Sequence, residues 1–222
     1  MKNLEIYIHI PFCVRKCEYC DFLSFPADDD AKLRYVKGLM AEMIFYGPLM
    51  KNYQVSSVYI GGGTPSSIDE QWIAALMEGV FDCFNVLPDA EISIECNPGT
   101  LSREKLLAYR DAGINRLSIG LQSANNDELK RLGRIHTFEQ FVTNYEVARN
   151  VGFKNINVDL MYGLPEQSAS QYMATVNKII RLHPDHISAY SLIVEKGTPF
   201  YEKYKFDMVR QEAGMRTEFL PN

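Results

Sequence analysis

Residues 4–20 read LEIYIHIPFCVRKCEYC, an apolar run that ends in a proline and then in three closely spaced cysteines. The run is nearly continuous, as in strands that are buried on both faces. Five more runs rich in Ile, Val, Leu and Tyr follow, at residues 57–60, 91–96, 116–120, 155–161 and 186–193. Amphipathic stretches with a helical period lie between them, at residues 31–45, 69–84, 102–112, 137–151 and 168–182. This alternation predicts an α/β fold with a parallel sheet.

Two parallel architectures fit this alternation: a (β/α) barrel or part of one, and a doubly wound open sheet. Eight strand–helix units need about 250 residues, whereas this chain has 222 residues and only six predicted strands. Open sheets that bind dinucleotides carry Gly-x-Gly-x-x-Gly after the first strand, and here the cysteine segment stands in that place. The pattern therefore disfavours a full barrel and the Rossmann form, and it leaves a partial barrel open.

The composition excludes several classes of function. The net charge is −5 and the isoelectric point is near 5.4, so no basic field attracts nucleic acid or an anionic membrane. No apolar run approaches the roughly 18 residues that a membrane span needs, and the N-terminus does not resemble a secretory signal. Five cysteines are an odd number, and three of them fall within eight residues. We therefore predict a cytoplasmic protein with a metal site rather than a disulfide scaffold.

Unusual residues stand at the end of every predicted strand. The first strand runs into the cysteines, and the others carry or run into GGGTP at 61–65, ECNPG at 95–99, GLQS at 120–123, Asp159 with YGLP at 162–165, and SAYS at 188–191. Sites in parallel α/β folds form at the carboxyl ends of the strands. These segments therefore predict one large site spread over a barrel mouth.

The spacing of Cys13, Cys17 and Cys20, C-x3-C-x2-C, lets a short loop turn three thiolates toward one centre. Soft thiolates select zinc or iron–sulfur clusters. Structural zinc takes four protein ligands, for which His9 is the candidate fourth, whereas three ligands on a cubic cluster leave one iron open. The spacing favours the cluster and leaves zinc open. Cys83 and Cys96 are interpreted as packing cysteines.

Other strand-end residues suit a polar ligand. Gly61–Gly63 lack the Lys-Ser/Thr of a phosphate loop, but consecutive glycines let a backbone approach a ligand closely. Glu95 is placed to receive an ammonium or a ribose hydroxyl, and Arg134 to pair with a carboxylate. Asp159, inside an apolar strand, needs a partner because a buried carboxylate is costly. The remaining histidines are interpreted as structural: His136, His183 and His186.

Residues 7–13 and 20–22, YIHIPFC and CDF, resemble the signature of radical S-adenosylmethionine (SAM) proteins. More narrowly, they resemble the oxygen-independent coproporphyrinogen III oxidase group. The resemblance extends to about residue 200, through residues 61–66, 91–100, 116–136, 157–165 and 186–200. It implies a partial (β/α)6 TIM-like barrel over residues 1–203, with residues 204–222 as a tail or the start of a further domain.

The resemblance also implies a set of cofactor ligands. Cys13, Cys17 and Cys20 would hold a [4Fe–4S] cluster, with the amino and carboxylate groups of SAM on the fourth iron. An electron from the cluster would cleave the sulfonium to a 5′-deoxyadenosyl radical. By motif position, Tyr7 and Tyr19 would flank the cofactor, Gly62, Gly63 and Thr64 would contact its methionine end, Glu95, Gln122, Arg134 and Asp159 would contact its polar groups, and Ile193 would pack near the adenine.

One departure from the group separates its branches. Coproporphyrinogen dehydrogenases carry a fourth cysteine two residues beyond the third, and here that position is Phe22. Asp21-Phe22 and residues 131–136, RLGRIH, resemble the HemW branch, which is regarded as a family of haem chaperones that deliver haem to acceptor proteins. The alternative is an oxidase that makes protoporphyrinogen IX by radical decarboxylation. An RNA-modifying radical SAM enzyme is disfavoured by the acidic balance.

The resemblance implies partners as well. Haem or a porphyrin, a reducing electron donor and haem-acceptor proteins are expected, without nucleic acid. HemW-like proteins continue well beyond residue 222, and the His-Asn motif proposed to ligate haem lies in that later part. We therefore expect the cluster and SAM sites in this chain and the haem site outside it.

Overall fold

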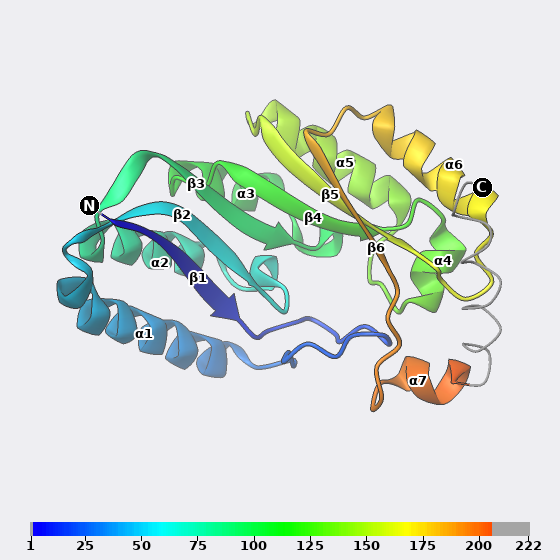
Figure 1. Ribbon diagram of the computed structural model, residues 1–222, viewed down its shortest axis with the longest axis horizontal. Helices are drawn as coiled ribbons and strands as arrows, with labels where there is room; N and C mark the ends of the chain where they lie inside the picture. The colour runs from blue at the N-terminus through cyan, green and yellow to red at the C-terminus, as the bar shows by residue number, and fades with distance from the viewer. Residues whose placement is uncertain (1, 206–222) are drawn as a thin grey trace.

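A computed structural model describes residues 2–205, which form one six-stranded parallel sheet with the strands in chain order (Figure 1). No strand is inserted between two that follow each other in the chain, and β1 and β6 are the two edges. The strands are β1 (Lys2–Ile10), β2 (Tyr53–Gly62), β3 (Val86–Cys96), β4 (Arg116–Gln122), β5 (Asn155–Tyr162) and β6 (His186–Ser191). The sheet is thus a half-barrel.

Five longer helices follow the strands and cover the convex face of the sheet, as Figure 1 shows. They are α1 (Asp29–Tyr46), α2 (Glu70–Cys83), α3 (Arg103–Asp111), α5 (Phe138–Asn150) and α6 (Ala169–Ile180), with short α4 (Asn126–Arg131) and α7 (Pro199–Tyr204) near the carboxyl ends of the strands. Single 3-10 turns are η1 (Gly47–Met50), η2 (Pro65–Ser67) and η3 (Pro98–Thr100). A doubly wound sheet reverses its strand order at a switch point, so the partial barrel is confirmed and the open-sheet alternative is wrong.

The main core lies between the sheet and these helices. Ile60, Ile94, Leu117 and Val158 point from neighbouring strands into this layer and are wholly buried. The expectation that every strand is buried on both faces is wrong for the edges, because β1 alternates and β6 is mostly exposed. The helices cover only the convex face, so the concave face of the half-barrel is free to carry polar side chains.

The ends of the elements follow local chemistry. The Ser102 side chain accepts from the Lys105 amide and caps α3, as predicted. Gly113 and Gly152, which close α3 and α5, adopt the predicted left-handed backbone with φ of 88° and 103°. Helix α7 was not predicted, and it crosses the expected boundary at residue 203. Apart from its first two residues, the predicted tail 204–222 lies outside the described residues.

Two glycine substitutions test this account of the helix ends. Gly152→Ala places a side chain at φ 103°, and we expect it to lower the free energy of unfolding by about 1 kcal/mol or more. Gly38→Ala lies on the exposed face of α1 with no atom near its new methyl group, and we expect a gain of about 0.5–1 kcal/mol. Urea unfolding of both variants measures the change in the free energy of unfolding. Changes of the same sign in the two variants would contradict this account of the helix ends.

Candidate cofactor site

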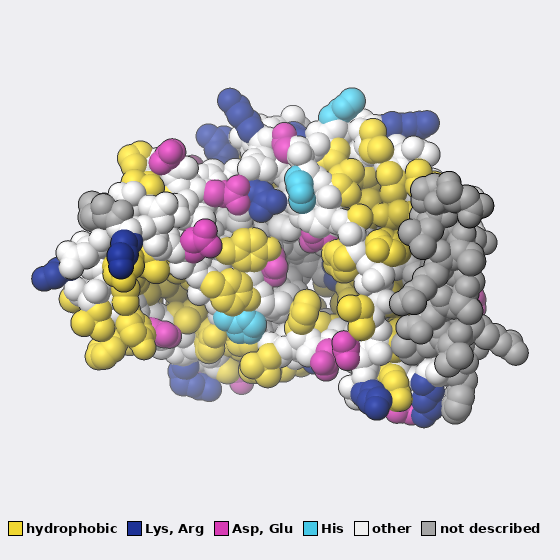
Figure 2. Space-filling model, in the orientation of Figure 1, with side chains coloured by type: hydrophobic (Ala, Val, Ile, Leu, Met, Phe, Trp, Pro, Cys, Tyr) yellow, Lys and Arg dark blue, Asp and Glu magenta, His cyan; other side chains and the backbone are white. Residues whose placement is uncertain are grey.

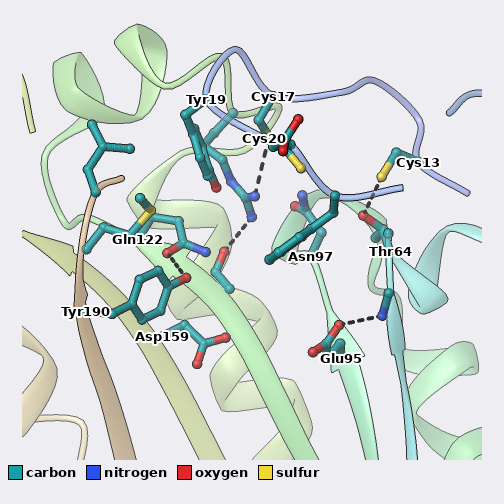
Figure 3. Close-up of a pocket in the computed structure, with 18 of the residues that line it drawn as sticks. Cys13, Cys17, Tyr19, Cys20, Thr64, Glu95, Asn97, Gln122, Asp159 and Tyr190 are labelled. Atoms are coloured by element: carbon teal, nitrogen blue, oxygen red, sulfur yellow. Dashed lines mark hydrogen bonds between the residues drawn. The ribbon is translucent and has the colours of Figure 1, made fainter. Parts of the chain in front are cut away.

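The carboxyl ends of the strands surround a cavity of about 350 Å³, visible as a hollow in Figure 2 and in close-up in Figure 3. All but one of the predicted site residues line it: Cys13, Cys17, Tyr19, Cys20, Gly62, Gly63, Thr64, Glu95, Gln122, Arg134, Asp159 and Ile193. Only Tyr7 lies outside this lining. The structure therefore gathers residues from all six strand ends into one place.

The three cysteines are free, half-buried thiols on the loop after β1. Cys13 Sγ lies 3.4 Å from the Thr64 hydroxyl, and the Arg134 guanidinium donates to Cys17 Sγ at 3.6 Å. Burial raises the pKa of the Cys20 thiol. Among residues 2–205, no three Cys, His, Asp or Glu side chains surround one ion position. Cys13, Cys17 and Cys20 nevertheless all line the cavity, so the three thiols border one space.

His9, the candidate fourth zinc ligand, does not turn toward the cysteines. Its Nδ1 lies 3.0 Å from the Tyr7 hydroxyl and its Nε2 lies 3.4 Å from the Leu23 carbonyl oxygen. Tyr7 is more than half exposed, and its ring stacks on that of Tyr59 at 6.2 Å. The pair thus connects β1 to the segment that follows the cysteines, and neither residue lines the cavity.

Gly62 at the end of β2 and Gly63 directly after it permit a close approach of the end of β1 and of the start of the cysteine loop. A Cβ on Gly62, whose φ is 119°, would lie 2.7 Å from the His9 ring. A Cβ on Gly63 would lie 2.8 Å from the Phe12 carbonyl oxygen and 3.1 Å from Cys13 Sγ. Glycine is therefore required here for packing against the loop, in addition to any contact with a ligand.

Glu95 is held without a cation. Its carboxylate accepts from the Tyr59 hydroxyl at 2.8 Å and from the Gly62 amide at 3.0 Å. Burial raises the pKa of Glu95 above its ordinary value. Sequence reasoning missed Tyr59, although the two-residue alternation along β2 places it on the same face as Gly61.

A β-bulge at the end of β4 aims two groups at the cavity. Gly120 pairs with Asp159 and Gln122 with Leu160, so the residue between them is extra, and Gln122 has φ 75°. The Gly120 carbonyl accepts from Arg134 Nη2 at 2.6 Å, and Gln122 Oε1 accepts from the Tyr190 hydroxyl at 3.0 Å. Non-glycine residues at positive φ are uncommon and cluster at functional sites.

Arg134 keeps one donor unused. Its Nη atoms contact Gly120 and Cys17, whereas its buried Nε has no hydrogen-bond partner within the described chain. A buried unpaired donor is costly, so the site is incomplete without an acceptor.

Asp159 has the partners that a buried carboxylate needs. Asn157 donates to it at 2.7 Å, and the Ser118 hydroxyl donates at 3.3 Å. Burial raises its pKa all the same. Asn157 also lies 2.6 Å from His186 Nδ1, so this histidine belongs to the polar network of the concave face. Asn157 and Ser118 were not predicted, because alternation along a strand does not say which polar side chains meet across strands.

The other predicted residues differ in burial. His136 is buried between the Asn97 side chain and the Leu121 carbonyl, and burial together with nearby Arg134 lowers its pKa to about 3, as suits a structural residue. His183 is exposed. Ile193 lies beyond the end of β6, and 66% of it is exposed at the cavity rim. Cys96 is buried and Cys83 half-buried against the main core, consistent with packing.

Comparison with known proteins identifies the family. Residues 7–179 match the model of the radical SAM superfamily. The chain belongs to this superfamily. Membership implies a [4Fe–4S] cluster and SAM as cofactors, in agreement with the cluster that the cysteine spacing favours.

Its relatives include haem chaperones. HemW of Escherichia coli (strain K12) is 39% identical over 203 residues, which are 89% of this chain and 52% of that protein. HemW of Bacillus subtilis (strain 168) is 40% identical over 196 residues, 88% of this chain and 52% of that protein. Coproporphyrinogen III oxidase (HemN) from E. coli, described as a radical SAM enzyme, superposes with a TM-score of 0.80 at 28% identity, over 98% of this chain and 52% of its own. The chain thus spans about half the length of these relatives.

Within residues 2–205, no helix is both long enough and apolar enough to cross a bilayer.

The opposite pKa directions of two aspartates give a stability test on the cofactor-free protein. Because burial raises the pKa of Asp159, its ionised form costs stability as pH rises through that raised value. We expect Asp159→Asn to raise the free energy of unfolding at pH 7 and to lose this advantage as pH falls toward the carboxyl range. Urea unfolding between about pH 4.5 and pH 8 measures the trend.

Asp185 is the matched control. Burial pushes its pKa upward, but the Ile156 amide at 2.9 Å and the Arg149 guanidinium at 2.8 Å bring it below the ordinary value. Its ionised form therefore adds stability above the ordinary pKa of 3.8, and this contribution is lost only below that value, outside the range used for Asp159. Asp185→Asn should lower the free energy of unfolding by a similar amount throughout the pH range used for Asp159. Destabilisation at pH 7 by both substitutions would contradict the assignment.

Proposed function

We propose that this chain is the cluster- and SAM-binding part of a haem chaperone of the HemW type. The observation that carries the proposal is the meeting of three free thiols with Gly63, Glu95 and Arg134 around one cavity. HemW relatives match at 39% and 40% identity over nearly nine-tenths of the chain.

Cys13, Cys17 and Cys20 would hold the cluster. Two donors stand beside their sulfurs, the Thr64 hydroxyl and the Arg134 guanidinium. Hydrogen bonds to the sulfurs and solvent exposure tune the reduction potential of such a cluster. When bound, the cluster and SAM supply one-electron radical chemistry, and the protein supplies position and shielding.

The polar groups of the cavity match those of SAM. Its ammonium and ribose hydroxyls need acceptors, and Glu95 and Asp159 present carboxylate oxygens with raised pKa values. Its carboxylate needs donors, and the unpartnered Nε of Arg134 is one. A volume of about 350 Å³ lies in the range of small-molecule sites, roughly 300–1,000 Å³. Tyr7, Tyr19, Gly62, Gln122 and Ile193 complete the proposed contacts.

Phe22 favours the chaperone over the oxidase. It stands where the resembling dehydrogenases carry a fourth cysteine, so no thiolate is available at this position. The Phe22 side chain is 71% exposed. The oxidase stays the second candidate, supported by the superposition on HemN. In either case we expect a reducing partner and a cytoplasmic location.

Cysteine substitutions test the cluster. Anaerobic reconstitution with iron and sulfide should give about four irons per chain. Cys13→Ala, Cys17→Ala and Cys20→Ala should each abolish the bound cluster, measured by iron content and visible absorption. Cys83→Ala is the matched control, because Cys83 is a half-buried cysteine outside the cavity, and it should keep the cluster. An intact cluster in Cys17→Ala would overturn the ligand assignment.

A chimera tests the choice of function. Residues 1–203 replace the corresponding half of E. coli HemW, and haem transfer to an apo-acceptor is measured with the intact E. coli protein as the positive control. We expect the chimera to load a cluster and transfer haem, because the two sequences share 39% identity there.

The same chimera is incubated anaerobically with coproporphyrinogen III, SAM and a reductant beside E. coli HemN. The oxidase candidate predicts protoporphyrinogen IX, and the chaperone proposal predicts none. A cluster-loaded chimera that makes this product, or that fails to transfer haem, would contradict the proposal.

A further inference from the structure

The cysteine loop, residues 13–20, is anchored by segments that come much later in the chain. The Glu18 amide donates to the Leu132 carbonyl at 3.3 Å, and the Glu18 carbonyl accepts from the Phe200 amide at 3.0 Å. Arg15 donates to the Gly133 carbonyl at 2.8 Å. The middle of the loop is therefore held from two sides by the turn after α4 and by the start of α7, not by the sheet.

A small hydrophobic cluster, separate from the main core, lies at this anchor. Its buried members are Leu132, Met161, Leu164 and Phe200, and the partly buried Tyr19, Leu192, Val194 and Tyr204 pack against them. Phe200 is wholly buried, and its ring meets that of Tyr19 edge-on with centroids 6.4 Å apart. Tyr19 stands between Cys17 and Cys20 in the chain and lines the cavity (Figure 3). The Phe200 ring thus packs directly against Tyr19 in this part of the loop.

Helix α7 depends on the same contacts for its own order. It has six residues, too few to be stable alone. Thr198 caps it by accepting from the Tyr201 amide at 3.1 Å, and the Thr198 hydroxyl donates to the Glu195 carbonyl at 2.7 Å. The Phe200 and Tyr204 rings meet at 4.9 Å. The helix and the cysteine loop therefore order each other.

We propose that Phe200 is a positioning residue that holds Tyr19, and through it Cys17 and Cys20, in place before any cofactor binds. The inference rests on the proposed function for its consequence, the binding of the cluster and SAM, but not for its structural part. Because the cluster around Phe200 is separate from the main core, its loss should free the loop while the sheet stays intact.

Amide hydrogen exchange on the cofactor-free protein tests the structural part. Phe200→Ala should speed exchange of the Glu18 amide by about tenfold or more, since local opening sets this rate, and leave amides within β2–β5 unchanged. The matched control is Phe141→Ala, which removes an equally buried phenylalanine from the main core. That change should speed amide exchange in the strands, with no greater effect on the cysteine loop than on the strands.

Cofactor binding gives the second readout. In the reconstituted protein, Phe200→Ala should release iron to a chelator faster and weaken SAM binding by about tenfold, whereas Phe200→Leu, which keeps an apolar side chain, should recover most of both. Thr198→Val keeps the side-chain volume and removes the cap of α7. Thr198→Val should also speed exchange of the Glu18 amide, but by a smaller factor than Phe200→Ala. It therefore provides the test if Phe200→Ala does not fold.

Two outcomes would overturn the inference. One is an unchanged exchange rate of the Glu18 amide in both Phe200→Ala and Thr198→Val. The other is faster exchange in Phe200→Ala spread over the strands, as expected for Phe141→Ala. A selectively freed loop in a protein that never binds SAM would instead contradict the proposed function and leave the positioning role intact. The two failures are therefore distinguishable.

Discussion

Everything at the site depends on six strands that run parallel in chain order. Each strand returns through a helix on the same face, so all carboxyl ends meet at one rim and the five longer helices lie on the convex face. This topology brings together the cysteine loop after β1, the glycines at the end of β2, Glu95 on β3 and the bulge on β4.

Within residues 2–205, the longer helices cover only the convex face of the half-barrel, and polar side chains line the concave face. Two hydrogen bonds on this face join neighbouring strands. Tyr59 donates to Glu95, and Ser118 donates to Asp159. Burial raises the pKa of both carboxyls, although Arg116 opposes the shift at Asp159 and His9 opposes it at Glu95. Desolvated carboxyls cost stability, and under the proposed function they would gain partners from a cationic, hydroxyl-bearing ligand. This is the usual relation between stability and a preorganised site.

Order at the rim is not uniform. The glycines after β2 lie against one end of the cysteine loop, and α7 with its own small hydrophobic cluster supports the other. Under the proposed function the loop holds a metal cluster, and its three cysteines line the cavity rather than continue the sheet. Its position therefore comes from side contacts, and these are drawn from residues as distant as Leu132 and Phe200.

Much of the candidate site was predictable because most of its residues have a local signature. The cysteine spacing, the glycine run, Glu95, Asp159 and Arg134 are unusual where they stand, the motif resemblance placed Gln122, and Tyr190 lies in a predicted strand-end segment. Tyr59 and Asn157 were missed, since they are ordinary strand residues until their partners on other strands are known. Helix α7 was missed because six polar and aromatic residues carry no clear periodicity.

The sequence by itself therefore determined the parallel α/β class, the six strands, the caps of α3 and α5 and the residues with metal-binding chemistry, because these depend on short-range patterns of side-chain type and backbone freedom. The resemblance also predicted the partial barrel, which the structure confirms. Only the tertiary structure decided that His9 turns away from the cysteines, that Gln122 projects from a bulge and that Phe200 supports Tyr19. These depend on contacts between residues tens to more than a hundred positions apart, and the packing of the whole sheet sets their geometry.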